Sequence, residues 1–137
     1  MFRLSVVTPE KIVYDDDVAS IVAPGSVGYL GILSNHAPII TSLVPGKLTI
    51  KDSTGQEIMM AVSGGFLENS SNTCTILADA AEFAHQIDVD RAQRAMDRAK
   101  ERIRNAAGNI DIPRAQASYA RAHNRVTIGT HHKAVSQ

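Results

Sequence analysis

The chain has 137 residues, enough for one domain with a hydrophobic core, or for a smaller domain with an appendage, but not for two full-sized globular domains. Its 14 basic and 14 acidic residues cancel, and this balance by itself favours neither nucleic acid nor an anionic membrane as a partner. The balance hides a split, because residues 1–87 carry a net charge of −5 and residues 88–137 carry +5.

The single cysteine, Cys74, excludes an internal disulfide and fits a reducing compartment. It lies in the strand-like run Thr73–Leu77, where we expect a buried structural thiol rather than a reactive one. The sequence has no run of 18 apolar residues, and its first residues lack the order of a signal peptide. We therefore expect no direct insertion into a membrane.

Residues 3–78 contain short runs rich in Val, Ile and Thr, separated by Pro, Gly, Asn or Asp. A spacing of roughly 8 to 12 residues between such runs is typical of a β-sandwich or barrel. The expected strands are 3–8, 11–14, 18–23, 27–33, 39–43, 47–52, 57–63, 66–68 and 73–78.

After Ile87 the period of the apolar residues changes to that of an amphipathic helix. Asp88 is a suitable N-cap, and Gly108 is expected to end this first helix. The apolar stripe of the first helix contains Ala92, Ala95, Met96, Ala99, Ile103 and Ala106.

A second helix is expected to start at Asp111 and Pro113 and to continue to about Val126, with the tail from Thr130 disordered. Its expected apolar positions are Ala115, Ala117, Tyr119, Ala120 and Ala122. The predicted fold is thus an N-terminal antiparallel β-sandwich, residues 1–87, followed by a C-terminal antiparallel two-helix hairpin, residues 88–137.

Several patterns that suggest chemistry have simpler interpretations. The glycines of Gly25–Gly31 match no phosphate-binding motif and are expected in turns. His36 is expected to order a loop, since one histidine cannot supply a metal site. Asp15–Asp17 lacks calcium-loop spacing and is expected in a solvated turn. His131-His132 lies in the tail, where we expect at most a chance affinity for metal without a function. We predict no catalytic constellation and no metal site, so a metal-dependent β-barrel enzyme is the least favoured class.

Arginines recur at three- and four-residue spacing on both predicted helices. Arg91, Arg94 and Arg98 lie on the first helix, and Arg121 and Arg125 lie on the second. Such a set either binds phosphates or carboxylates through its guanidinium groups or forms a solvated helix face. Nucleic-acid binding is less favoured, because Tyr119 is the only aromatic residue of the basic half.

Together, six motifs in order make the chain resemble the epsilon subunit of F-type ATP synthase along almost its whole length. The motifs are Val7-Thr8-Pro9-Glu10; Gly28, Gly31 and His36-Ala37-Pro38; Pro45-Gly46; Ser63-Gly64-Gly65-Phe66-Leu67-Glu68; Thr75-Ile76-Leu77-Ala78-Asp79; and Ile87-Asp88-x-x-Arg91-Ala92.

The resemblance implies a non-catalytic subunit of the central rotor stalk. Its sandwich would bind the gamma subunit and the c ring, and its hairpin would contact the alpha and beta subunits when extended and inhibit ATP hydrolysis. It would be a peripheral protein on the cytoplasmic side of the bacterial plasma membrane, with the plastid thylakoid less favoured. The alternative is an ATP-sensing module. No cofactor is required in either case.

Some members of the family bind ATP on the folded hairpin as a regulatory ligand. Carried over to this chain, the implied ATP site contains Glu82, Asp88, Arg91, Ala92, Arg98, Arg121 and Arg125. The implied contacts with the c ring and gamma involve Gly28, Tyr29, Gly31 and His36.

Three residues depart from the family pattern. Tyr29 replaces an acidic residue that faces the c ring, and Ser34 replaces a proline. Asn124 replaces a leucine of the second helix, which weakens the apolar seam of the hairpin. We therefore expect the folded hairpin to be less stable without its ligand.

Overall fold

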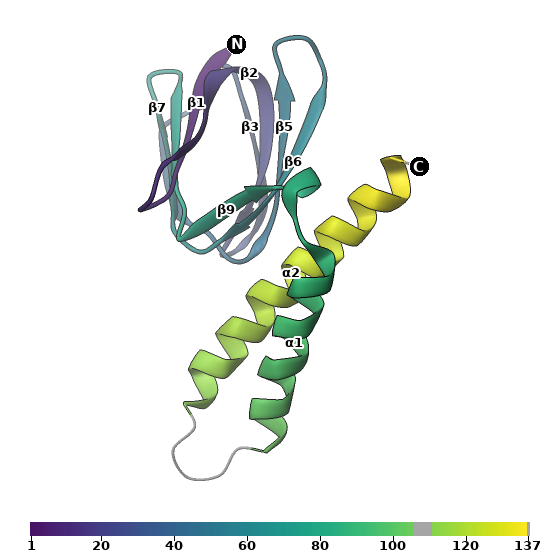
Figure 1. The fold of residues 1–137 in the computed structure, drawn as a ribbon. Coiled ribbons are helices and arrows are strands. Elements are labelled where there is room, and N and C mark those ends of the chain that lie inside the picture. Colours follow the sequence, from purple (N-terminus) through teal and green to yellow (C-terminus); the bar gives the residue numbers. More distant parts are fainter. Residues whose placement is uncertain (106–110, 137) are drawn as a thin grey trace. The chain divides into compact units, whose positions relative to one another are not determined.

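The computed structural model describes residues 1–105 and 111–136 (Figure 1). The chain forms two compact units, Met1–Phe83 and Ala84–Gln137. The first unit is a β-sandwich and the second is helical, which confirms the predicted fold class. The expected helix stop at Gly108, and the stripe position Ala106, lie outside the described residues.

The nine strands of the sandwich belong to one continuous, folded sheet. The strands are β1 (Phe2–Val7), β2 (Ile12–Gly25), β3 (Gly28–Leu33), β4 (Ile39–Ser42), β5 (Gly46–Asp52), β6 (Glu57–Ser63), β7 (Phe66–Ser70), β8 (Thr73–Leu77) and β9 (Ala80–Phe83). Their order is β4-β7-β8-β1-β2-β5-β6-β9, and β3 also pairs with β2. All pairs are antiparallel except β1 with β8, which is parallel. In Figure 1, β1 and β7 lie on one side of the core and β5 and β6 on the other.

Strand β2 takes part in both layers. Its first half pairs with β1, and after a register shift near Val18 its second half pairs with β5 and β3. The expected turn at Asp15–Asp17 is wrong, because these residues continue the strand. Arg3 lies across from them, and its guanidinium contacts the carboxylates of Asp15 at 2.9 Å and Asp17 at 3.7 Å. This cross-strand pairing offsets the low strand propensity of aspartate.

Strand β9 was not expected from the sequence. It pairs with β6, where Ala81 lies opposite Val62 and Phe83 lies opposite Met60. The segment Ala-Ala-Glu-Phe has no β-branched residue, so its own preference for a strand is weak. Pairing with the already formed edge of β6 therefore decides its conformation.

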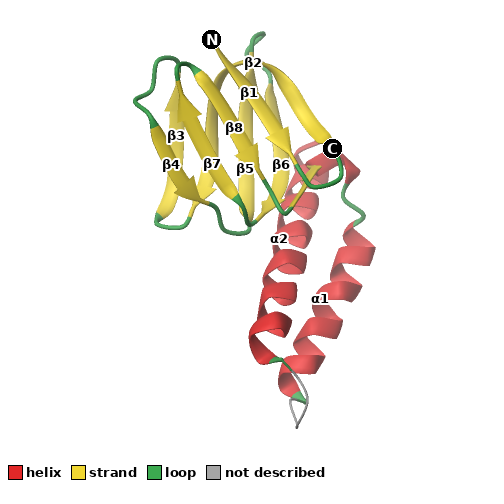
Figure 2. Ribbon diagram, turned by 90° about the vertical axis from the view of Figure 1, so that its left-hand side faces the viewer, coloured by secondary structure: helices red, strands yellow, loops and turns green. Residues whose placement is uncertain are grey.

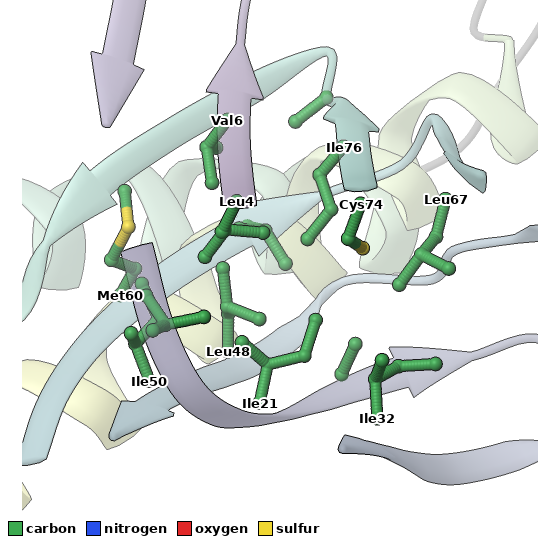
Figure 3. Close-up of a cluster of buried hydrophobic side chains, with 14 of the residues drawn as sticks. Leu4, Val6, Ile21, Ile32, Leu48, Ile50, Met60, Leu67, Cys74 and Ile76 are labelled. Atoms are coloured by element: carbon green, nitrogen blue, oxygen red, sulfur yellow. The ribbon is translucent and has the colours of Figure 1, made fainter. Parts of the chain in front are cut away.

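Branched aliphatic side chains fill the space between the layers (Figure 3). Leu4, Ile21, Leu48 and Ile76 are each at most 1% exposed. Cys74 is buried among them, as predicted, and burial raises the pKa of its thiol to about 12. A thiol with this pKa stays protonated at neutral pH, which fits a structural role.

The second unit begins with a short 3₁₀ turn, η1 (Ala84–Gln86), followed by α1 (Val89–Arg104) and α2 (Ile112–Ser136) (Figure 2). The predicted N-cap is confirmed, because Oδ1 of Asp88 accepts from the backbone N–H of Arg91. At the predicted start of the second helix, Oδ1 of Asp111 accepts from the backbone N–H of Arg114 in the same way.

Small residues line the seam between α1 and α2. Ala92 and Ala99 of α1 and Ala115 and Ala122 of α2 are all at most 5% exposed. The two alanines of each helix are seven residues apart and so lie on the same face. Their methyl groups permit close approach of the two helices. The expected seam positions Ala117 and Ala120 are wrong, because both are exposed on α2.

The prediction that the tail from Thr130 is disordered is also wrong, because α2 continues through Ser136. Gly129 lies inside this helix and packs closely against the start of the unit. A Cβ atom added to it would lie 2.7 Å from Cγ2 of Val89 and 3.0 Å from Cγ2 of Ile87. The glycine therefore permits contact between the segments rather than ending the helix.

Candidate functional sites

The charges of arginines on both helices act on Asp88, the N-cap residue of α1. The pKa of the Asp88 carboxyl is lowered, first by the hydrogen bond from the backbone N–H of Arg91 and then by the charges of Arg94, Arg91 and Arg125. Arg125 is on α2 and half-buried, whereas Arg91 and Arg94 are exposed. We call Arg91, Arg94 and Arg125 the arginine cluster. It brings together three positive charges, which suits an anion with several oxygens.

The other residues of the implied ATP site are more dispersed. The methyl group of Ala92 is fully buried in the helix seam and has no polar atom. Arg121 donates from Nη2 to Oγ of Ser118 on its own helix, at 3.1 Å. Arg98 is exposed on α1, two turns beyond Arg91. Glu82 belongs to the other compact unit, on β9.

Gly28 and Tyr29 begin β3 at the tip of the β2–β3 hairpin. Gly28 has φ of +130°, which favours glycine, and its neighbour Val27 is 97% exposed. The Tyr29 side chain is fixed, because its hydroxyl oxygen accepts from the backbone N–H of Lys47 at 3.1 Å. The tip therefore presents an aliphatic side chain and an oriented aromatic ring.

His36 lies beyond the other end of β3, and Gly31 lies exposed in the middle of that strand. As predicted, His36 takes part in ordering its loop: its Nδ1 atom lies 2.7 Å from the carbonyl oxygen of Ala37. Its own carbonyl oxygen accepts from Nδ2 of the buried Asn69. Since a six-residue strand is about 20 Å long, the structure does not unite His36 with Gly28 and Tyr29 in one cluster.

Apolar side chains, four of them exposed and one half-buried, form a row across the outer face of the sandwich. Val7 lies opposite both Ile12 and Leu77, and Leu77 lies opposite Phe66, so the four residues share one face of adjacent strands. Ile12, Leu77 and Phe66 are 54–62% exposed, and Ile40 of the neighbouring strand is 72% exposed. We call these five residues the apolar row. Contiguous exposed apolar surface of this kind marks a site of interaction.

The apolar row adjoins the hairpin tip through Ser42. This residue lies opposite Phe66, and its hydroxyl donates to Oγ of Ser26 at 2.9 Å. The backbone N–H of Ser26 also donates to the carbonyl oxygen of Ser42. The row and the tip are therefore two parts of one end of the sandwich. The sequence analysis missed the row, although Phe66 beside the inward-facing Leu67 is a signal that strand alternation makes readable.

Within residues 1–105 and 111–136, no group of three or more His, Cys, Asp or Glu side chains is arranged to hold a metal ion. In the same residues, no helix combines the length and apolar character needed to span a membrane.

Both units match models of known protein families. Residues 1–84 match the β-sandwich domain of the ATP synthase delta/epsilon chain, and residues 85–128 match the long α-helix domain of the same chain. The two matches meet next to the boundary between the compact units. The fold thus defines a two-domain subunit of the ATP synthase delta/epsilon type.

Relatives of known identity agree over nearly the full length. The ATP synthase epsilon chain of Desulforamulus reducens is 44% identical over 124 residues, which cover 90% of this chain and 93% of the relative. The epsilon chain of Pediococcus pentosaceus is 45% identical over 135 residues, covering 96% of both. That of Latilactobacillus sakei is 42% identical over 136 residues, covering 96% and 94%. The chain belongs to the ATP synthase epsilon chain family.

Two solved structures share the fold at low sequence identity. A chain in the OSCP/F1/c-ring structure of the Euglena gracilis mitochondrial ATP synthase has a TM-score of 0.77 at 20% identity, covering 88% of this chain and 76% of that one. A chain in the central stalk/c-ring structure of the Tetrahymena thermophila enzyme has a TM-score of 0.62 at 18% identity, covering 94% and 93%.

Proposed function

We propose that this chain is a non-catalytic subunit of the central rotor stalk of an F-type ATP synthase. In this proposal the sandwich joins the gamma subunit to the c ring, and the helical unit restrains ATP hydrolysis through the alpha and beta subunits. The three epsilon-chain relatives named above are bacterial, so the complex would lie at the plasma membrane with this chain on its cytoplasmic side.

The observation that carries the proposal is the apolar row on a member of this family. A row of exposed aliphatic and aromatic side chains is costly to leave in water, and burial against a partner removes that cost, at about 25 cal/mol per Å². We assign the row to the gamma subunit. A permanent partner of a rotor must hold its position under torque, and apolar burial gives attachment that salt does not screen.

The adjoining hairpin tip is assigned to the c ring. Because Tyr29 stands where an acidic residue is common and its hydroxyl is bonded to Lys47, this contact would depend on packing rather than on an ion pair. The contact should therefore vary little with ionic strength.

Phe66→Glu should weaken binding to gamma at least about tenfold, because it places a charge within an apolar contact. Phe66 is 58% exposed, so the sandwich itself should keep its fold. The affinity is measured by calorimetric titration of the purified gamma subunit with each variant.

The matched control is Thr73→Glu, which puts the same charge on an exposed position of β8, at the end away from Leu77. It should bind gamma like the unmodified chain. Equal affinity of Phe66→Glu and Thr73→Glu would show that the apolar row is not the gamma site.

The arginine cluster favours a second candidate function, regulatory ATP binding by the helical unit. Three guanidinium groups that all act on the Asp88 carboxyl can neutralise the charges of a triphosphate, and Asp88 caps the first turn of α1. A nucleotide that binds only the compact hairpin would shift the chain toward that state by its difference in affinity for the two states.

Arg91→Ala should reduce ATP binding to the isolated full chain in a calorimetric titration, because one of the charge-assisted contacts is lost. Arg104→Ala is the control, since Arg104 lies at the other end of α1 beside Glu101. If both variants bind ATP like the unmodified chain, the arginine cluster is not a nucleotide site.

A further inference from the structure

The continuation of α2 beyond Thr130 brings together two histidines that are far apart in the sequence. The imidazole rings of His85, in η1, and His132, near the end of α2, have centroids 6.4 Å apart and planes inclined by 51°. His85 is exposed and His132 is half-buried, so an ion can reach both from solvent.

A separate observation fixes this proximity. Gly129, one turn before His132, packs against Ile87, two residues after His85. Any side chain at Gly129 would separate the two segments, because its Cβ would lie 3.0 Å or less from the side chains of Ile87 and Val89. The packing of Gly129 against the side chains of Ile87 and Val89 therefore keeps the segments that carry the two histidines close together, independently of the contact between the rings.

We propose that His85 and His132 form a two-histidine binding site for a transition-metal ion, with Zn²⁺ as the ion that fits best. Imidazole nitrogen is a preferred zinc ligand at about 2.0–2.1 Å, and two imidazoles on one tetrahedral zinc have ring centroids roughly 5 Å apart. The observed separation of 6.4 Å is slightly greater than this value. Water molecules complete the coordination, because the site supplies two protein ligands.

Zinc bound in this way joins the 3₁₀ turn to the end of α2. An ion that binds the compact helical unit and not an opened one stabilises the compact state by mass action. The site is distinct from the arginine cluster in chemistry, because it uses neutral nitrogen ligands and a cation rather than guanidinium groups and an anion.

The test is calorimetric titration of the full chain with zinc chloride, with magnesium chloride as the control ion that prefers oxygen ligands. We expect one Zn²⁺ per chain, and hydrogen exchange at the C-terminal turns of α2 should slow when zinc is added. His132→Asn and His85→Asn should each abolish binding at zinc concentrations that saturate the unmodified chain.

His131→Asn is the matched control, because it removes the adjacent, exposed histidine of the same helix. It should keep both the zinc affinity and the slower exchange, and far-ultraviolet circular dichroism should show equal helix content in all variants. Absence of zinc binding by the unmodified chain would overturn the proposal. So would equal losses in His131→Asn and His132→Asn, or binding that survives His85→Asn.

Discussion

An ATP synthase reconstituted with residues 1–83 alone should hydrolyse ATP faster than one reconstituted with the full chain. The cut removes the helical unit, which carries a net charge of +5 and is proposed to restrain hydrolysis through the alpha and beta subunits. The core of the sandwich consists entirely of residues from Phe2 to Phe83, so the shortened chain keeps its own packing. Steady-state ATPase assays of the two complexes at equal protein concentration measure the effect.

The control for this experiment is the full chain carrying Phe66→Glu. That variant should also leave hydrolysis unrestrained, but it should be lost from the complex during gel filtration, whereas residues 1–83 should stay bound. Added salt should narrow the difference between full-length and shortened complexes, because screening weakens contacts made by a unit with a net charge of +5. Equal ATPase rates with and without the helical unit would refute the inhibitory role.

Gly65→Ala should destabilise the sandwich by about 3–5 kcal/mol, the range of the most disruptive single substitutions. Gly65 has φ of +99°, and an added Cβ would overlap the carbonyl oxygen of Leu77 and lie 2.9 Å from Cα of Ala78. These are backbone atoms of the neighbouring segment and cannot rotate away. The same glycine precedes Phe66, so its conformation also sets the position of the apolar row.

Gly55→Ala separates the effect of backbone strain from that of steric overlap. Gly55 has φ of +86°, but nothing lies within 4 Å of its added Cβ, so only backbone strain of about 1–2 kcal/mol applies. Cys74 reports on the sandwich alone, because it is the only cysteine and is buried there. The rate at which the Cys74 thiol is labelled at increasing urea concentrations should rank the variants by the stability of the sandwich. Similar labelling rates of Gly65→Ala and Gly55→Ala would show that relieving the overlap with Leu77 costs little free energy.

Much of the fold can be predicted from periodicity, since alternation in residues 3–78 and helical spacing after Ile87 each match the structure. The misses lie where partner segments override local preference. Asp15–Asp17 forms a strand because Arg3 stabilises it from β1, and β9 forms because β6 offers an open edge. Gly129 lies within a helix because close packing against Ile87 compensates for its low propensity.

The candidate sites were predictable to different degrees. The i,i+3 and i,i+4 spacing placed Arg91 and Arg94 on one helix, but only the antiparallel packing of α2 shows that Arg125 joins them. The apolar row was not predictable in the same way. Alternation indicates that Phe66 points outward, but the row depends on the register of five strands. One of these pairings is the parallel one of β1 with β8, which no local pattern reveals.

That parallel pair also sets the order in which the chain can fold. Strand β1 is synthesised before the other strands of the sheet, but its partner β8 begins only at Thr73. The β1–β8 pair at the centre of the sheet can therefore form only after most of the sandwich has been synthesised. Contacts of such long sequence separation form slowly. In the helical unit, α1 packs against the next helix in the sequence, α2, so this unit should fold quickly once it is synthesised. During synthesis, the exposed strands of the unfinished sheet are therefore the part of this protein most in need of protection from aggregation.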